Sequence, residues 1–131
     1  MLNKICSILL IFGLFGPLYA LDFNSMAKSA LKEKKLILLS VESDNCRYCE
    51  KMNKETFTPK ENILKIQSHY VQKIVIEENT DLPANFDVKY YPTNFILNPK
   101  DMSIIDEFVG YMKADDFLSL LDVVYEEEAK N

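Results

Sequence analysis

The chain has 131 residues, of which 48% are hydrophobic, and its formal net charge is −5. This length suits one domain and is short for two, and the hydrophobic fraction is enough for a core that needs no disulfide or metal to hold it. The negative charge and the lack of a Lys/Arg run argue against nucleic acid and against anionic membrane surfaces as partners.

The first twenty residues have the pattern of a secretory signal peptide. Lys4 makes the start positive, residues 5–15 are almost continuously apolar, and the segment ends in the small residue Ala20. Because the apolar stretch is shorter than the roughly 20 residues that span a bilayer core, we expect cleavage after Ala20 rather than retention as an anchor. The mature protein would then be periplasmic or otherwise extracytoplasmic, without stable membrane insertion. Cleavage also removes Cys6, and residues 21–131 form one domain.

The first elements of this domain are a helix and a strand. Apolar residues at helical spacing predict an amphipathic helix over residues 24–32. The near-continuous apolar run at residues 36–41 is typical of a strand that is buried on both faces. A polar turn follows, in which Asp44 or Asn45 is expected to cap a helix that opens at Cys46.

A second helix is predicted from Thr58 to about Ser68. Thr58 and Glu61 have the spacing of a capping box, and Pro59 suits the first helical position, where its missing N–H costs nothing. The next elements are expected to be a strand, a polar turn and a short helical turn, at residues 71–76, 79–81 and 82–86.

The last part of the chain predicts a hairpin and a closing helix. Residues 93–97 and 103–109 are expected to be antiparallel strands joined by a short turn. A helix over residues 114–127 places four apolar residues on one face: Phe117, Leu118, Leu121 and Val124. Strands separated by helices, then a hairpin and a final helix, predict an α/β fold with a central mixed β-sheet flanked by helices.

Cys46 and Cys49 stand at the start of the helix that follows the buried strand, with two residues between them. This spacing brings the sulfur atoms together across the first helical turn, with Cys46 facing solvent. The N–H groups and the dipole at a helix start stabilise a thiolate, and Arg47 adds a cation. We therefore predict Cys46 as the nucleophile and Cys49 as the cysteine that resolves the mixed disulfide. Arg47 and Tyr48 are expected to tune this chemistry.

The chain resembles the thioredoxin superfamily over residues 24–127. The resemblance rests on the C-x-x-C motif, on Tyr91-Pro92-Thr93 about forty residues later, and on Gly110 before the closing helix. Residues 46–57 most resemble the small exported thioredoxin-like proteins of bacteria. The resemblance implies a thioredoxin-like fold and a cis bond between Tyr91 and Pro92 that faces the cysteines. It also implies a substrate-binding surface at Tyr91, Pro92 and Thr93, where extended peptide would pair with the strand edge.

The same resemblance implies an extracytoplasmic thiol–disulfide oxidoreductase that acts on protein thiols and disulfides. It would need no cofactor besides the redox-active pair of Cys46 and Cys49. The chain has no room for the helical insertion of the periplasmic oxidases and lacks a dimerisation domain like that of the isomerases. We therefore favour a protein disulfide reductase that is kept reduced by a membrane redox partner.

One departure from thioredoxin concerns the buried acid of that protein. The position that resembles it is Ser40, so proton relay through a buried Asp is not expected. Glu42 is interpreted as a surface acid at the strand end; the alternative is that it substitutes for the buried acid, if the loop is one residue longer.

Two other functions stay open. The protein could be a non-catalytic binding or chaperone module whose disulfide is structural, or a copper chaperone that holds Cu(I) with both thiols and Met52. Met52 is interpreted first as a core residue. Structural zinc needs about four Cys or His ligands, and His69 is the only histidine, so no metal site is predicted and His69 is interpreted as a surface residue.

Overall fold

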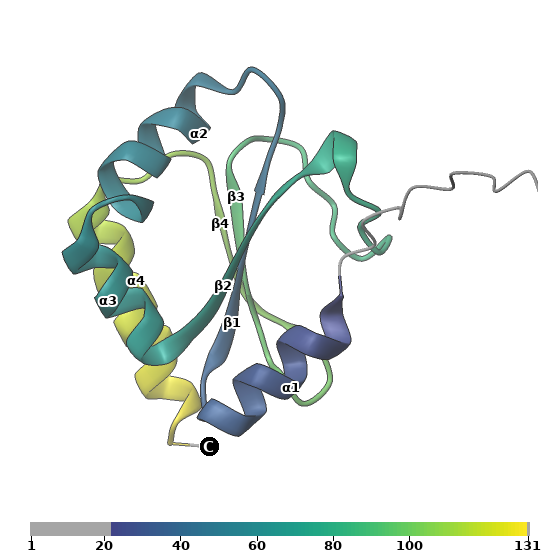
Figure 1. Ribbon diagram of the computed structural model, residues 1–131, viewed down its shortest axis with the longest axis vertical. Helices are drawn as coiled ribbons and strands as arrows, with labels where there is room; N and C mark the ends of the chain where they lie inside the picture. Colours follow the sequence, from purple (N-terminus) through teal and green to yellow (C-terminus); the bar gives the residue numbers. More distant parts are fainter. Residues whose placement is uncertain (1–21, 131) are drawn as a thin grey trace, which may run out of the picture.

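Helices and strands alternate along residues 22–130, the part of the chain that the computed structural model describes (Figure 1). The predicted signal peptide, including Cys6 and the cleavage position after Ala20, lies outside these residues and stays a prediction. Within residues 22–130, each helix is too short or too polar to cross a bilayer.

The central sheet has four strands in the order β2-β1-β3-β4. Along the chain these strands are β1 (Leu36–Glu42), β2 (Tyr70–Ile76), β3 (Thr93–Leu97) and β4 (Ile104–Val109). β1 runs parallel to β2, with Leu36 opposite Tyr70, and antiparallel to β3, with Val41 opposite Thr93. β3 and β4 form the predicted antiparallel hairpin. The prediction of a mixed sheet in an α/β fold is confirmed.

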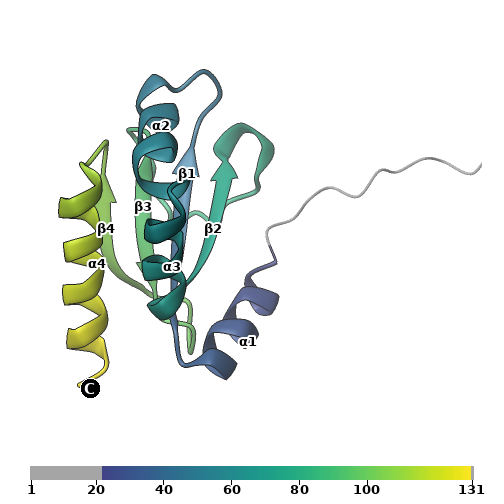
Figure 2. The same ribbon diagram turned by 60° about the vertical axis from the view of Figure 1, so that its left-hand side comes forward.

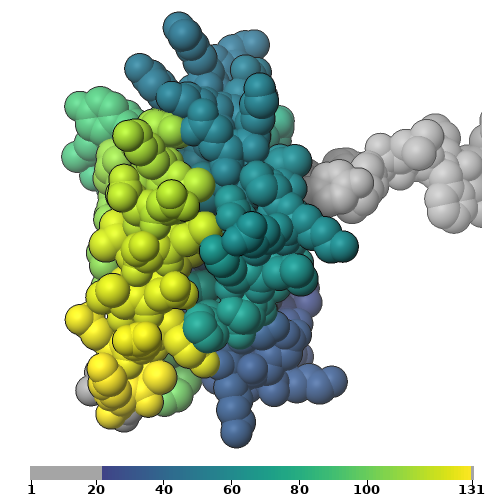
Figure 3. Space-filling view, turned by 90° about the vertical axis from the view of Figure 1, so that its left-hand side faces the viewer, coloured from purple at the N-terminus to yellow at the C-terminus, as the bar shows by residue number. Residues whose placement is uncertain are grey.

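Helices cover both faces of the sheet (Figure 2). The helix α1 (Phe23–Glu33) lies on one face. The other face carries α2 (Arg47–Met52), α3 (Lys60–His69) and α4 (Ala114–Glu128). Figure 3 shows α3 and α4 side by side on the outside of this layer, with α2 beyond the end of α3. Because both of its faces are covered, β1 is buried at every residue, as the apolar run predicted.

Alternate residues of β1 enter two separate cores. Leu36 and Leu38 join the core beneath α2, α3 and α4, whereas Ile37 and Leu39 join the core beneath α1. The predicted apolar face of α4 is buried in the first core through the four residues Phe117, Leu118, Leu121 and Val124. Fully burying one such side chain contributes about 1.5–3 kcal/mol, so these two cores hold the helices against the sheet.

The connection from α2 to α3 differs from the prediction. A π-helical turn, η1 (Asn53–Phe57), continues the winding of α2, and the N–H of Thr58 donates to the carbonyl of Asn53 at 2.8 Å. An N-cap residue needs a non-helical backbone, but Thr58 is still helical, with φ −94° and ψ −36°. The predicted capping box is therefore wrong: Pro59 is the N-cap of α3, without a side-chain capping bond.

The segment between β2 and β3 contains less helix than expected. A 3₁₀ turn, η2 (Glu77–Asn79), follows β2. In place of the predicted helical turn over residues 82–86 there is one hydrogen-bonded turn, closed by the N–H of Phe86 and the carbonyl of Pro83 at 3.0 Å. The ring of Phe86 is buried between the rings of Phe23 and Phe95, with centroids at 5.9 and 5.1 Å. Together with Leu82 and Val88, which pack against the same core, this ring anchors the segment.

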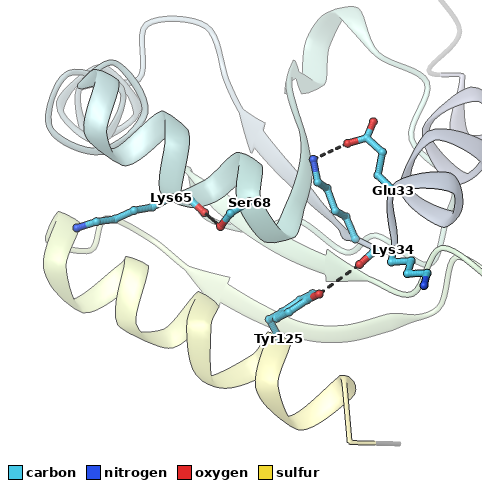
Figure 4. Close-up of polar contacts among 6 residues, drawn as sticks. Glu33, Lys34, Lys65, Ser68 and Tyr125 are labelled. Atoms are coloured by element: carbon cyan, nitrogen blue, oxygen red, sulfur yellow. Dashed lines mark hydrogen bonds and ion pairs between the residues drawn. The ribbon is translucent and has the colours of Figure 1, made fainter.

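The end of the sheet where β1 begins is closed by contacts between α1, β1 and α4 (Figure 4). The hydroxyl of Tyr125 on α4 donates to the carbonyl of Lys34 at 3.3 Å. Lys34 has φ 55°, a left-handed conformation that ends α1 and turns the chain into β1. The cysteines lie at the opposite end, where β1 stops.

Candidate functional site

Cys46 and Cys49 form a disulfide beyond the carboxyl end of β1, with their Cα atoms 5.2 Å apart. Three residues separate the strand from Cys46. The last of them, Asn45, has φ 57°, a left-handed conformation that Asn adopts more readily than most residues. This turn redirects the chain from the sheet into α2.

The first turn of α2 is capped by Cys46 itself. Cys46 has the extended backbone of an N-cap, with φ −89° and ψ 100°, and its Sγ accepts a hydrogen bond from the N–H of Cys49 at 3.1 Å. The expectation that Asp44 or Asn45 caps the helix is wrong, because Asn45 does not have this backbone; α2 begins at Arg47. A backbone N–H that points at the sulfur from a helix start is the kind of donor that stabilises a thiolate once a disulfide is reduced.

The two cysteines differ in their exposure to solvent. Cys46 is partly exposed, whereas Cys49 is 2% exposed and packs inside the molecule. Arg47 and Tyr48, the residues between them, are both exposed. The ring of Tyr48 lies 6.3 Å from the ring of Tyr111, centroid to centroid, so the aromatic residue between the cysteines has a second aromatic ring beside it.

Tyr91, Pro92 and Thr93 lie at the same end of the sheet as the disulfide. Thr93 begins β3 and is opposite Val41, near the end of β1. The Tyr91–Pro92 peptide bond is cis, and the Pro92 carbonyl accepts from the N–H of Gly110 at 2.7 Å. Pro92 and Thr93 are buried, and Tyr91 is partly exposed. The structure therefore brings the two predicted groups of site residues to one end of the fold.

The side chain of Tyr91 is held by a contact that the sequence did not indicate. Its hydroxyl donates to the carboxylate of Glu77 in η2. The neighbouring residue Tyr90 is 69% exposed, and Val109 is 54% exposed. A hollow of about 290 Å³ adjoins this surface and is lined by Asp87, Lys89, Tyr90, Thr93, Glu107 and Val109. Tyr90 and Val109 were missed because no sequence pattern distinguishes an exposed apolar residue at a site from any other.

Met52 and His69, the other residues weighed as ligands, have ordinary structural roles. Met52 is buried among core residues, and its Sδ lies 3.8 Å from Nδ2 of Asn94, which confirms its interpretation as a core residue. His69 is partly exposed at the end of α3. Its ring stacks on that of Tyr125 at 3.9 Å between centroids.

Two polar residues of β1 are buried next to the site. Ser40 donates a hydrogen bond from its hydroxyl to Oδ1 of Asn94 at 2.6 Å. Glu42 is 6% exposed, so its interpretation as a surface acid is wrong. Its Oε2 accepts from Nδ2 of Asn53 at 3.2 Å. Burial raises the pKa of Glu42, an effect that the hydrogen bond from Asn53 partly opposes.

Comparison with known proteins assigns the described residues to one domain type. Residues 23–125 match the family model of a thioredoxin-like domain. No curated protein sequence gives a significant match.

Several solved structures have a similar fold. A thioredoxin from Thermus thermophilus has a TM-score of 0.63 and 19% identity over 76% of this chain and 81% of that chain. The oxidised C-terminal domain of DsbD from Neisseria meningitidis has a TM-score of 0.58 and 21% identity over 76% and 89% of the two chains. The reduced periplasmic thioredoxin SoxS from Paracoccus pantotrophus has a TM-score of 0.54 and 18% identity over 72% and 99%.

Proposed function

Because this chain belongs to the family of thioredoxin-like domains, we propose that it reduces protein disulfides outside the cytoplasm through Cys46 and Cys49. The observation that carries the proposal is the inequality of the two cysteines. Cys46 is partly exposed and accepts an N–H bond at the start of α2, whereas Cys49 is buried beside it. A reductase of this type needs one sulfur that meets the substrate and a second that is reserved for the intramolecular step.

The reaction consists of two thiol–disulfide exchanges. In the first, the thiolate of Cys46 attacks one sulfur of the substrate disulfide, that S–S bond breaks, and one substrate thiolate leaves and takes up a proton. In the second, the thiol of Cys49 loses its proton and its sulfur attacks Sγ of Cys46, the mixed disulfide breaks, and the other substrate thiolate leaves and takes up a proton. Two electrons pass to the substrate, and the protein is left with the Cys46–Cys49 disulfide. The cysteine pair is the only redox group that these steps require.

The substrate in this proposal is an extended protein segment that lies across Tyr91, Pro92 and Thr93. These residues share one end of the sheet with the cysteines. The expected free strand edge is absent, because β3 lies between β1 and β4 and Thr93 is paired with both Val41 and Val109. Pairing with an extended peptide therefore falls to the backbone of Tyr91, before β3 begins. The exposed side chains of Tyr90 and Val109 offer apolar surface for substrate side chains. The hollow beside Thr93 adds charged groups, from Asp87, Lys89 and Glu107. Tyr48 and Arg47 border the nucleophile and would influence which segments reach it.

Further observations support the proposed compartment and the proposed direction of electron flow. The first twenty residues have the signal-peptide pattern, and one protein of similar fold is a periplasmic thioredoxin. Residues 22–130 contain the sheet and its covering helices and no inserted helical domain like that of the periplasmic oxidases. A membrane redox partner would return electrons to the disulfide.

Reduction of insulin disulfides by the purified protein tests the activity. We expect turnover with wild-type protein and dithiothreitol, and loss of that turnover in Cys46→Ser. If insulin reduction in the presence of wild-type protein is no faster than in its absence, the alternative of a binding or chaperone module is favoured. The reduction potential tests the direction of electron flow. A value of about −270 mV, as in thioredoxin, supports a reductase, whereas a value of about −120 mV, as in a strong oxidase, contradicts it. Cell fractionation tests the compartment.

A further inference from the structure

Tyr91, with whose backbone the proposed substrate would pair, lies just outside the sheet. β3 begins at Thr93, so the strand ladders do not hold Tyr91 in place. On one side of it, the hydroxyl of Thr93 donates to the carbonyl of Tyr90 at 2.7 Å. On the other side, the N–H of Gly110 donates to the carbonyl of Pro92 at 2.7 Å. Both bonds are made by the neighbours of Tyr91, which leaves its own placement to its side chain.

The side chain of Tyr91 is held at its ring and at its hydroxyl. The ring is partly exposed and packs against the core beneath α1, and the hydroxyl donates to the carboxylate of Glu77. A hydrogen bond to a carboxylate is charge-assisted and stronger than one between neutral groups. In the described part of the chain, no cation forms an ion pair with Glu77 that would compete for this carboxylate. Glu77 therefore locates the outer end of Tyr91.

Glu77 belongs to a turn that is fixed to the end of β2. This turn is η2, and two hydrogen bonds from Thr80 close it. The N–H of Thr80 donates to the carbonyl of Glu77 at 3.0 Å, and its hydroxyl donates to the carbonyl of Ile76 at 2.8 Å. Ile76 is the last residue of β2 and is paired with Glu42 of β1. Because η2 is anchored to the sheet in this way, it can hold the hydroxyl of Tyr91 at a defined place.

The next residue of the same turn contacts the segment that carries the nucleophile. Oε2 of Glu78 accepts from the N–H of Asp44 at 3.2 Å. Asp44 precedes Asn45, whose left-handed backbone turns the chain toward Cys46. β1 and β2 are parallel, so the turns that follow them leave the sheet at the same end. Two adjacent glutamates of η2 thus contact the substrate-pairing segment and the segment before Cys46.

The sheet by itself does not set the position of Tyr91 relative to Cys46. Thr93 is paired with Val41, but β1 ends at Glu42, and three residues separate that strand from Cys46. Both residues therefore stand beyond the ends of their strands, and η2 contacts both segments. This relative position matters for the reaction, because a misplacement of about 1 Å can slow a chemical step about 100-fold.

We propose that Glu77 is a positioning residue for peptide substrates. By holding the hydroxyl of Tyr91, it keeps the backbone of Tyr91 where an extended peptide is brought in line with Sγ of Cys46. A small disulfide reaches Cys46 without pairing with Tyr91, so Glu77 distinguishes disulfides carried by a peptide from small ones. The inference rests on the proposed function for the roles of Cys46 and Tyr91, but it does not require that the protein turns over protein disulfides.

The rates at which Cys46 attacks two disulfides with the same leaving group test this role. One is a short unstructured peptide whose single cysteine is joined to thionitrobenzoate, and the other is the symmetrical disulfide of thionitrobenzoate. In each case the thiolate of Cys46 attacks one sulfur, the S–S bond breaks, and thionitrobenzoate leaves and is followed by its absorbance. Full-length protein that carries Cys49→Ser confines the measurement to this first step.

Glu77→Ala should lower the rate with the peptide about tenfold relative to the rate with the small disulfide. Tyr91→Phe should lower it equally, because each variant removes one partner of the same bond, and the double variant should be no slower than either single one. Glu77→Gln should restore the wild-type ratio of rates, because its amide oxygen still accepts from the hydroxyl. Asn79→Ala, which alters an exposed residue of the same turn, should keep the wild-type ratio.

A wild-type ratio in Glu77→Ala overturns the inference. An equal loss of rate with both disulfides also overturns it, because that is the result of a purely structural role. Catalytic reduction of insulin separates this inference from the proposed function. If the two rates respond as expected but the wild-type protein does not accelerate insulin reduction, the proposed function fails and the role of Glu77 stands.

Discussion

The backbone N–H of Cys49 donates a hydrogen bond to Sγ of Cys46 at 3.1 Å. Cys46 is therefore both a site residue and the N-cap of the helix that holds its partner. The same geometry leaves Cys46 partly exposed and buries Cys49. The helix start thus gives the two cysteines different environments, and this difference leads to the first two predictions.

Alkylation of the reduced protein should modify Cys46 before Cys49. Cys46 is partly exposed and its Sγ accepts from the N–H of Cys49, a donor that favours a thiolate there, whereas Cys49 is only 2% exposed. Limiting iodoacetamide near neutral pH, followed by peptide mass spectrometry, measures the order. Preferential labelling of Cys49 would show that the assignment of the two roles is wrong.

Mixed disulfides should accumulate in cells that produce Cys49→Ser. This variant keeps the nucleophile and loses the sulfur that releases the substrate, so substrates stay attached to Cys46. Cys46→Ser should trap few or none. Non-reducing electrophoresis with mass spectrometry of the trapped partners distinguishes the two variants, and equal trapping by both would mean that attack is not confined to Cys46.

The stability of the oxidised protein should depend on pH through Glu42. Burial raises the pKa of Glu42 above its ordinary value of 4.5, so the folded protein binds this proton more tightly than the unfolded chain does. The stabilising contribution is therefore fully present below pH 4.5 and is lost as the pH rises through the folded pKa. Between pH 4.5 and the pKa of Glu42 in the folded protein, the free energy of unfolding of the wild type should fall by up to about 1.4 kcal/mol per pH unit relative to that of Glu42→Gln.

This dependence is measured by urea unfolding of the oxidised proteins from about pH 4 to about pH 8, a range that covers the expected loss of stability. Glu50→Gln is the matched control, because it removes an exposed carboxyl from α2, the helix that follows β1, and it should follow the wild-type curve. If the difference in free energy of unfolding between wild type and Glu42→Gln is constant with pH, Glu42 has the same proton affinity in the folded and unfolded states and the prediction is wrong.

Tyr91→Phe should destabilise the protein by about 1 kcal/mol, because it removes the hydroxyl that donates to the carboxylate of Glu77. That contact ties the segment before β3 to the end of β2. The adjacent Tyr90 offers the control: its side chain is 69% exposed, and Tyr90→Phe should change the free energy of unfolding by less than about 0.5 kcal/mol. Equal effects of the two substitutions, measured by urea unfolding, would contradict the role of the Glu77 contact.

The elements that local pattern determines were predicted well from the sequence. Residues 36–41 are apolar at every position except Ser40, and they form β1, a strand covered on both faces. The strand at residues 93–97 has the predicted bounds, and the four apolar residues of the last helix face the core. Periodicity succeeds in these segments because burial on one or both faces is what selects the apolar residues. The C-x-x-C spacing likewise located the cysteine pair without any tertiary information.

Helix caps and buried polar groups depended on the tertiary structure. Asn45 and Thr58 are residue types that commonly cap helices. The turn before the disulfide gives Asn45 a left-handed backbone, and the π-helical turn keeps Thr58 helical, so neither is a cap. Glu42 appeared to be a surface acid because it stands at the end of an apolar run. It is buried because α2 and η1 pack over that end of β1 and bring Asn53 to its carboxyl. Such contacts join residues whose separation carries no periodic signal, so only the folded chain determines which oxygen keeps a partner and which carboxyl has its pKa raised by burial.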